Sequence, residues 1–312
     1  MPITEKQRRE RINSIGSSDA AAVLGLSRWN TPLGIWSEKV GAVEPEDIGD
    51  QLPVIVGTEL ESLVIKLFCD KTGKKVEPGT PATVTHPKYD FIRANPDALI
   101  VGEDAGLEAK TASGWKAKEW EGEEIPKEYK IQCLHNMAVT GKKKWYLACL
   151  IGGNQDFRWV QINWDEKVIG QMMEREVEFW QKYVVPKIMP TMAHRDDDDV
   201  LFKMFPEGND PEALELGDAA NKIADSILAL QTDKAVLDGF IKKEKNALKA
   251  MLGDHAIAET NRYRITWKKQ TTRRFKLDLA KVKDWEFYDK CCEDSPSRVL
   301  RIKTKKSKEK TK

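Results

Sequence analysis

The sequence predicts an α/β (α+β) fold for residues 1–195, on the evidence of one strand pattern and two helix patterns. Residues 107–111 are consistent with a strand, whose successive side chains point to opposite faces. Residues 57–68 carry apolar side chains at the spacing of a helix, and residues 125–141 have Pro126 in the first turn of a helix that Gly141 ends. We therefore expect a sheet with helices packed against it.

The composition is that of a folded protein without a strong overall charge. The chain has 312 residues, about two domains in length, and 40% of them are hydrophobic, which suffices for a sizeable core. Its 51 Lys and Arg residues offset 50 Asp and Glu residues, so that a uniformly basic nucleic-acid coat is excluded and any DNA contact uses local patches. The polar N-terminus and the lack of an apolar run of about 18 residues predict a cytoplasmic protein with no membrane contact. Five cysteines without CxxC spacing indicate free thiols rather than a metal or iron–sulfur site.

Four regions follow one another along the chain. Residues 1–195 form the first folded unit, and an acidic linker, 196–210, begins with four consecutive aspartates. An accessory region with helical and β patterns spans 211–300. The last region, 301–312, is basic and poor in apolar residues, so we expect it to be disordered, with attraction to DNA or simple solubilisation as its role.

The accessory region contains a long helical stripe and a basic strand. Between residues 216 and 252, apolar side chains recur in steps of three, four or seven at Ile223, Ile227, Leu230, Leu237, Ile241, Leu248 and Met251. Lys234 and Glu244 interrupt the stripe, which favours a helical hairpin broken near residues 238–239, or a short coiled coil, over one buried helix. Residues 263–267 alternate as a half-buried strand with a basic outer face.

Two carboxylates and an ammonium are the central chemical signal of the sequence. If residues 107–111 form a strand, Glu108 and Lys110 share one face while Leu107 and Ala109 pack on the other. Asp97 precedes this strand, and we expect its carboxylate to lie near the side chains of Glu108 and Lys110. Carboxylates are hard oxygen ligands that suit Mg²⁺ or Mn²⁺, and Lys110 can offset the charge that develops on a scissile phosphate.

Glu61 adds a third carboxylate beside an apolar helix face. It lies next to the stripe of residues 57–68 rather than opposite it, so that its charge needs a partner. That partner is either a metal-bound water or a basic side chain in a salt bridge, and this helix alone favours the salt bridge.

The helix predicted at 125–141 carries polar groups on one face. Tyr129, Gln132 and Asn136 share this face by their three-and-four spacing, so that an amide there can orient a nucleophilic water or contact DNA. His135 lies one residue off the face and is interpreted as structural or surface-exposed. Trp115 and Trp120, in the preceding loop, are candidates for base stacking, with packing as the favoured alternative.

The N-terminal segment has features of an anion site. Ser17 or Ser18 can cap a helix that begins near Asp19, and a helix N-terminus presents free N–H groups to an anion. Arg11 can add a bidentate grip on a phosphate. The alternative is that Ser18 is only a helix cap and Arg11 only a surface charge.

Six motifs in this order resemble the YqaJ-type viral recombinase family, which is related to phage lambda exonuclease and to the restriction-endonuclease-like nucleases. The resemblance covers residues from about 10 to 195 and implies a mixed central sheet flanked by helices, as a nuclease domain. The motifs are IGSSD at 15–19, WSEKVG at 36–41, GTELE at 57–61, ANPD at 94–97, EAK at 108–110 and YKIQ at 129–132.

The resemblance also implies roles for individual residues. Asp97 and Glu108, with the main-chain carbonyl of Ala109, would bind Mg²⁺, or Mn²⁺ in its place, and Lys110 would be the catalytic lysine. Glu61 and Gln132 match the positions that bind or orient a second ion and the attacking water. Arg11 and Ser18 have the spacing of the pair that holds a 5′-phosphate, and Asn95 stands where lambda exonuclease has a serine. Ser17 and Tyr129 are further candidates for DNA contact.

The activity implied by the resemblance is metal-dependent 5′-to-3′ digestion of one strand of linear double-stranded DNA. The 3′ overhangs would go to a single-strand annealing protein of RecT or beta type, and relatives of lambda exonuclease form trimeric rings around DNA, which predicts a homo-oligomer. Two other hypotheses remain open: an endonuclease of the same chemistry, and a non-catalytic module that binds DNA ends or loads a recombinase.

Overall fold

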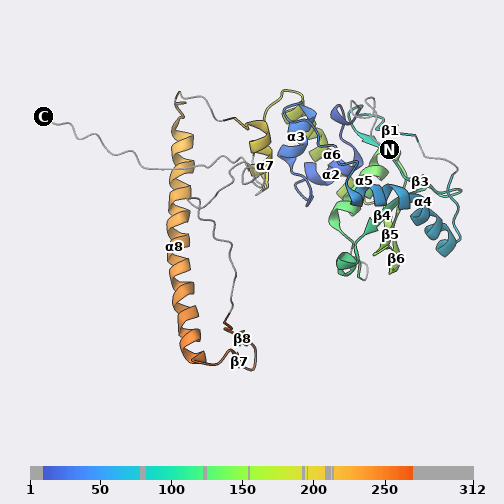
Figure 1. Ribbon diagram of the computed structural model, residues 1–312. Coiled ribbons are helices and arrows are strands. Elements are labelled where there is room, and N and C mark those ends of the chain that lie inside the picture. The colour runs from blue at the N-terminus through green and yellow to red at the C-terminus, as the bar shows by residue number, and fades with distance from the viewer. Residues whose placement is uncertain are drawn as a thin grey trace, which may run out of the picture. The chain divides into compact units, whose positions relative to one another are not determined.

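The computed structural model describes residues 10–77, 82–121, 125–153, 155–191, 194, 196–207, 212 and 214–269. The chain divides into two compact units, residues 1–206 and 207–312 (Figure 1). The predicted basic tail, 301–312, lies outside the described residues.

A four-stranded mixed sheet forms the centre of the first unit, as predicted. Its strand order is β3-β4-β5-β6. The central pair, β4 and β5, is parallel, while β3 and β6 pair with them in the antiparallel sense on either side. The four strands are β3 (Ala98–Leu99), β4 (Ala105–Ala112), β5 (Lys144–Ile151) and β6 (Asp156–Asn163).

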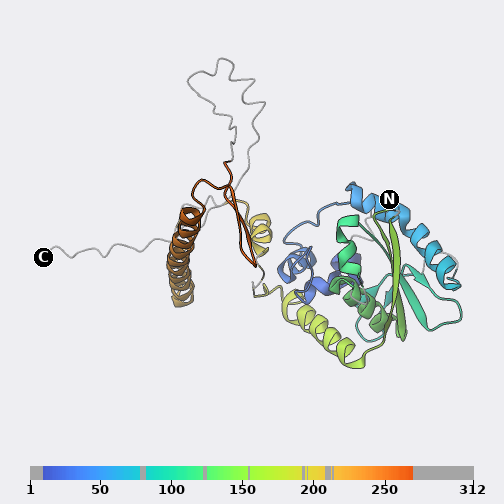
Figure 2. The same ribbon diagram turned by 90° about the horizontal axis from the view of Figure 1, so that it is seen from below.

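Helices cover both faces of this sheet, and the alternation of side chains along β5 shows how (Figure 2). Tyr146, Ala148 and Leu150 pack with Val64 and Phe68 of α4 (Leu52–Thr72). The intervening residues, beginning with Trp145, pack on the other face with α5 (Lys127–Thr140) and α6 (Glu166–Phe179). Because helices cover both faces, seven of the eight β5 residues are buried, and the sheet forms a rigid support.

Smaller elements surround this core. The N-terminal segment is joined to it by hydrogen bonds from the Ile15 N–H to the Phe91 carbonyl (2.7 Å) and from the Arg93 N–H to the Ile15 carbonyl (3.0 Å). These elements are α2 (Ser17–Val23), α3 (Pro32–Lys39), β1 (Val84–Thr85), β2 (Arg93–Ala94), η1 (Gly114–Trp120) and η2 (Trp180–Val184).

The start of α2 differs from the prediction. Gly16, rather than Ser17 or Ser18, is the N-cap residue, and the Asp19 carboxylate accepts a hydrogen bond from the Gly16 N–H at 3.1 Å. The carboxylate at the third helical position supplies the capping bond, so neither serine caps this helix.

The acidic run also differs from the prediction of a linker. It begins α7 (Asp197–Met204), in which Asp197 is buried and its carboxylate accepts from the His194 N–H at 3.1 Å. Acidic residues are favourable in the first turn of a helix because they interact with its positive N-terminal dipole.

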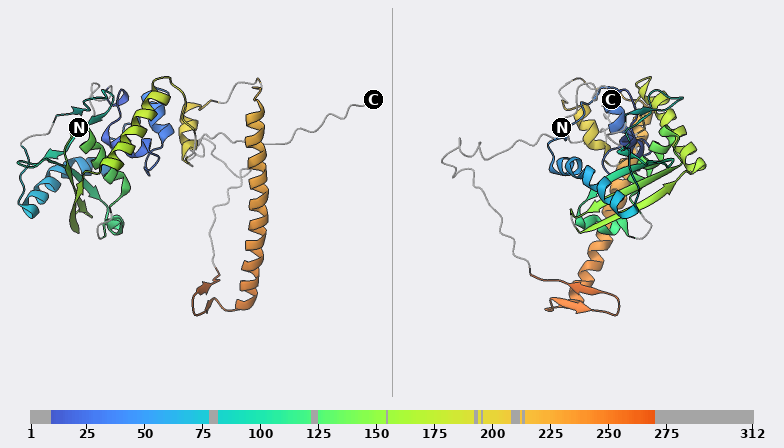
Figure 3. Two further views of the ribbon diagram at one scale, coloured as in Figure 1. Left: turned by 180° about the vertical axis from the view of Figure 1, so that it is seen from behind. Right: turned by 90° about the vertical axis from the view of Figure 1, so that its right-hand side faces the viewer.

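The second unit contains one long helix, α8 (Asp218–Leu252). The sequence had predicted either a helical hairpin or a short coiled coil in this region. The helix is unbroken through Gly239 (Figure 3), so the hairpin with a break near residues 238–239 is wrong. A single glycine in a helix costs only about 1 kcal/mol relative to alanine, which is too little to end the helix here. Two short antiparallel strands follow, β7 (Ile257–Glu259) and β8 (Arg264–Thr266), and the second lies within the predicted strand.

None of the helices in the described part of the chain combines the length and the apolarity that a bilayer-spanning segment requires.

His135 forms a buried ion pair inside the first unit, in agreement with a structural role. Its Nδ1 lies 3.0 Å from Glu176 Oε1 and its Nε2 lies 2.9 Å from the Arg93 carbonyl oxygen, with both ion-pair side chains fully buried. Both ring nitrogens therefore face acceptors, which requires a proton on each. Burial by itself lowers the pKa of His135, but Glu176 outweighs it and the net pKa is raised.

We expect His135→Ala to lower the free energy of unfolding by about 3–5 kcal/mol, because it leaves the Glu176 carboxylate buried without its partner. Urea unfolding measures this loss, and His255→Ala, at an exposed site of the second unit, serves as the matched control with little effect. A loss as small as that of the control would contradict the structural role of the pair.

The raised pKa of His135 also predicts the direction of a pH effect on wild-type stability. The contribution of the ion pair is complete below the ordinary histidine pKa of 6.5 and is lost as the pH rises through the raised value in the folded state. Urea unfolding in steps from about pH 6 to about pH 9 should therefore show a decline that is absent in His135→Ala. The same profile in both proteins would argue against a charged His135.

Candidate active site

The predicted acidic and basic side chains meet beside the middle of β4, next to the start of β3. Asp97 immediately precedes β3, Glu108 and Lys110 lie on β4, Glu61 comes from α4, and Gln132 comes from α5. A cavity of about 250 Å³ lies beside three of them, Glu61, Asp97 and Lys110, and its lining is completed by Val54, Gly57, Thr58, Ala109 and Thr111. The alternation of β4 is as predicted, because Leu107 and Ala109 pack in the apolar cluster on the α4 side.

Glu108 is the most tightly held of these side chains. Its carboxylate is 1% exposed and accepts hydrogen bonds from three side chains. Oε1 accepts from Lys110 Nζ and from Gln132 Nε2 (2.6 Å), and Oε2 accepts from Asn136 Nδ2 (3.0 Å). A buried carboxylate is stable only when its oxygens are paired in this way, so the two amides of α5 fix its position.

Asp97 lies close to this carboxylate and is strained electrostatically. Its Oδ2 accepts from the main-chain N–H of Ala109 at 2.7 Å. Burial and the nearby charge of Glu108 raise the pKa of Asp97 to about 8. A carboxyl group with so high a pKa is one whose negative charge is poorly compensated by the protein itself.

Glu61 faces the same cavity and forms no salt bridge with any described residue. The pattern of its helix had favoured a salt bridge, so this differs from the prediction. Burial and the charge of Glu108 raise its pKa, although Lys110 opposes the effect. The electrostatic need that the sequence indicated is therefore present, and no basic side chain from the described part of the chain meets it by direct contact.

Lys110 is the basic group of the site. Its Nζ pairs with Glu108 and lies 5.5 Å from the centre of the Tyr129 ring. Burial lowers the pKa of Lys110, but Glu108 and Asp97 outweigh burial and raise the net pKa, so the side chain is an ammonium at neutral pH. Tyr129 thus lies beside the site, as the helix spacing predicted.

The donor set fits a hard divalent cation. No three His, Cys, Asp or Glu side chains of the described residues converge closely enough to form a metal cage. Mg²⁺ commonly takes one or two carboxylates and completes its shell with water and substrate phosphates, for which the cavity beside Asp97 and Glu61 has room. The raised pKa values of these two carboxyl groups are the observation that a cation would relieve.

Two residues of the predicted phosphate site follow segments that are paired through one β-bridge. Ile15 and Ile92 form a parallel bridge, and Ser18 and Asn95 each follow three residues later, both exposed. Ser17 is buried and faces away from solvent. The chain is held here by Lys39, whose Nζ donates to the Asp19 carboxylate (2.7 Å) and to the Arg11 carbonyl (2.6 Å), while the Arg11 residue is exposed.

Aromatic residues adjoin the site on the side of Tyr129. The Tyr129 ring centre lies 5.7 Å from those of both Trp29 and Trp120. Trp120 is 3% exposed and packs in the core, which agrees with the packing role favoured over base stacking. Trp115, by contrast, is 97% exposed. Trp29, 57% exposed, was not singled out from the sequence, and its neighbours Arg28 and Lys116 place positive charge over its ring.

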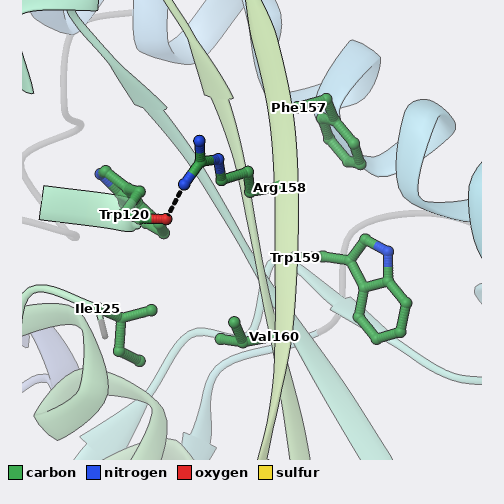
Figure 4. A pocket seen from close by; sticks show the side chains of 6 residues that line it. All are labelled: Trp120, Ile125, Phe157, Arg158, Trp159 and Val160. Atoms are coloured by element: carbon green, nitrogen blue, oxygen red, sulfur yellow. Dashed lines mark hydrogen bonds between the residues drawn. The ribbon is translucent and has the colours of Figure 1, made fainter. Parts of the chain in front are cut away.

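A second cavity, of about 390 Å³, lies at β6 and is lined by Trp120 but by none of the predicted catalytic or metal-binding residues (Figure 4). Arg158 points from β6 toward Trp120 and donates to its carbonyl, while Phe157 and Trp159 extend to the other side of the strand. Its lining contains no carboxylate, which separates it chemically from the site around Glu108.

Sequence reasoning missed how two residues support the site. Asn136 was expected to contact water or DNA, but it is fully buried and holds Glu108. Lys39 lies in the WSEKVG motif, to which no role was assigned, and no local pattern of the sequence indicates that its ammonium pairs with Asp19.

Comparisons with known proteins agree with this architecture. Residues 5–143 match the family described as the YqaJ-like viral recombinase domain. Protein YqaJ of Bacillus subtilis (strain 168) is 35% identical over 299 residues, which cover 94% of this chain and 92% of that protein.

Solved structures show the same fold. The alkaline exonuclease LHK-Exo of Laribacter hongkongensis is similar with a TM-score of 0.51 at 19% identity, over 59% of this chain and 94% of that one. Its complex with dAMP gives the same TM-score at 20% identity. The mixed sheet flanked by helices is thus the predicted restriction-endonuclease-like fold. The sequence identity to YqaJ over most of both proteins shows that the chain belongs to the YqaJ-like viral recombinase family.

Proposed function

We propose that this chain is a metal-dependent deoxyribonuclease that digests one strand of linear double-stranded DNA from its 5′ end. The observation that carries the proposal is the set of four ionisable side chains, Glu61, Asp97, Glu108 and Lys110, gathered beside β4. Structural similarity to an alkaline exonuclease supports the same class of reaction.

Mg²⁺, or Mn²⁺ in its place, would be held by Asp97, Glu108, Glu61 and the Ala109 carbonyl. We propose that two ions bind there. Bound Mg²⁺ supplies Lewis-acid chemistry and activates water for phosphodiester hydrolysis. Lys110 offsets the charge that develops on the scissile phosphate, because its side chain is an ammonium at neutral pH and lines the cavity beside Asp97. Gln132 fixes Glu108 and orients the attacking water, and Asn136 positions Glu108 from the other side.

The preference for a 5′ end rests on Arg11, Ser18 and Asn95. Ser18 and Asn95 are both exposed and both carry side-chain donors, and Asn95 lies two residues before Asp97, so we assign both to contacts with the terminal phosphate. The Arg11 guanidinium adds a bidentate contact, and the Lys39 bond to the Arg11 carbonyl restrains the main chain there.

Two finer parts of the proposal concern assembly and partners. The 3′ overhangs would be delivered to an annealing protein of RecT or beta type, and the nuclease unit would act as a ring-shaped homo-oligomer. Both follow from the resemblance to relatives of lambda exonuclease, and the description of the family as viral recombinases supports a role in recombination. An endonuclease of the same chemistry and a non-catalytic end-binding module are the alternatives that the following experiment separates.

Lys110→Ala should reduce the digestion rate of linear duplex DNA by at least about a hundredfold, because it removes the charge that stabilises the transition state. The substrate carries a label at the 3′ end of one strand and is incubated with Mg²⁺ or EDTA, beside a closed circular duplex. Gradual shortening of fragments that keep the label indicates 5′-to-3′ digestion, whereas immediate label release indicates the opposite polarity.

Lys182→Ala is the matched control, since this lysine is 57% exposed on η2, where it pairs with Glu178 and lies over the ring of Tyr183. Nicking of the circle would support the endonuclease. Binding without digestion, equal in wild type and Lys110→Ala, would support the non-catalytic module.

Mg²⁺ should raise the melting temperature of the wild-type protein, because a cation that binds only the folded state stabilises it by about 2.7 kcal/mol at a hundred times its Kd. Asp97→Asn should remove most of this rise by removing a charged ligand. Thermal melting with and without Mg²⁺ measures the effect, with Glu174→Gln on the exposed face of α6 as the control. An equal rise in Asp97→Asn would place the cation elsewhere.

Arg11→Ala should erase the preference for 5′-phosphorylated over 5′-hydroxyl DNA ends, since it removes the charged contact to the terminal phosphate. The ratio of initial digestion rates on the two substrates is the measurement. Arg175→Ala, a change of the same kind on exposed α6 surface, should leave the ratio unchanged. If the Arg11 variant keeps the wild-type ratio, Arg11 does not read the end.

A further inference from the structure

The α8 helix carries an apolar stripe that the described residues leave exposed. The helix has 35 residues, and only Leu252 at its last position is buried. Along the stripe, Leu230 is 64%, Leu237 is 60% and Ile241 is 51% exposed. Large apolar side chains in such a continuous row normally bind another surface.

The stripe follows a strict heptad pattern. From Ala220 to Met251, its positions alternate in steps of three and four, which is the pattern of a coiled coil. The ten positions are Ala220, Ile223, Ile227, Leu230, Lys234, Leu237, Ile241, Glu244, Leu248 and Met251. Only Lys234 and Glu244 are charged, and they carry opposite signs.

The positions of these two charges identify a partner and an orientation. Lys234 and Glu244 lie five residues on either side of Gly239. If two copies of α8 run antiparallel about a two-fold axis at Gly239, Lys234 of each copy faces Glu244 of the other. A surface that is complementary to itself about a two-fold axis is what a symmetric dimer requires.

The apolar positions fit the same register. Leu237 and Ile241 are each two residues from Gly239, Leu230 and Leu248 are each nine, and Ile227 and Met251 are each twelve. Each pair therefore forms one apolar layer between the helices. Phe240, 61% exposed, lies beside the axis and would pack against its own copy.

The parallel orientation is unfavourable for the same two residues. In register, it would place Lys234 against Lys234 and Glu244 against Glu244, with like charges in two core layers. We propose that α8 pairs with α8 of a second copy of this chain as an antiparallel coiled coil whose two-fold axis passes Gly239. This pairing uses α8 alone and is independent of the proposed nuclease activity.

A charge-exchange experiment on the full-length chain tests the pairing. Lys234→Glu and Glu244→Lys each place like charges opposite one another twice per dimer, so each should raise the dissociation constant roughly tenfold to a hundredfold. The double variant K234E/E244K restores opposite charges and should restore wild-type association. An equal mixture of the two single variants should also associate. Light scattering over a range of protein concentrations measures the mass.

Two controls carry the same charge changes on the outer faces of α8. Lys243→Glu and Asp225→Lys are at exposed heptad positions outside the stripe, so they should keep the wild-type mass. Circular dichroism reports the helix content of each variant, and equal content assigns a lower mass to lost pairing rather than unfolding.

Three results would overturn the proposal. A monomeric wild type would mean that residues beyond the described part of the chain cover the stripe. An unchanged mass in both single variants would place α8 outside the subunit contact. Failure of the double variant to recover association would exclude the antiparallel register.

Discussion

The Glu108 carboxylate, buried in the first unit, is the constraint on which the rest of the site depends. A carboxylate removed from water is costly unless donors surround it, and Glu108 has three: Lys110, Gln132 and Asn136. These donors come from β4 and α5, so the geometry of the site depends on the packing of α5 against the sheet. Burial, together with the charge of Glu108, raises the pKa values of Asp97 and Glu61 and makes the cavity beside them suited to a cation.

The rigidity of the surrounding fold preserves this arrangement. Helices cover both sheet faces, and the His135–Glu176 pair joins α5 to α6 behind the site. The Lys39–Asp19 pair joins α3 to α2 and restrains the backbone that carries Arg11. By contrast, the stripe of α8 has no cover among the described residues, so the first unit has a complete core while α8 is suited to association.

Local periodicity explains which parts could be predicted from the sequence. The alternation around Glu108 determined which side chains share a face of β4, and Pro126 and Gly141 marked the ends of the α5 segment to within two residues. The proximity of Glu61 to Asp97 and Lys110 did not follow from any local pattern. It came from a family resemblance, because separations along the chain carry no information about which elements pack together.

The missed features depend on contacts between distant segments or on small energy differences. Asn136 and Lys39 hold acidic side chains from other elements, and periodicity alone does not reveal such partners. Serine and aspartate are both good capping groups, so Ser17 or Ser18 was a reasonable prediction for the α2 cap. The sequence does not show that the Asp19 carboxylate makes the capping bond instead. The unbroken α8 reflects how little a single Gly239 costs in a long helix.

The central claim is that the buried carboxylate cluster is a cation site. Anomalous X-ray diffraction from crystals of the full chain grown with Mn²⁺ tests it most directly. The account predicts a peak in the cavity between Asp97, Glu61 and the Ala109 carbonyl, with the Lys110 ammonium still beside Glu108. A fully ordered site without a peak, or a peak only at surface carboxylates remote from this cavity, would contradict the account.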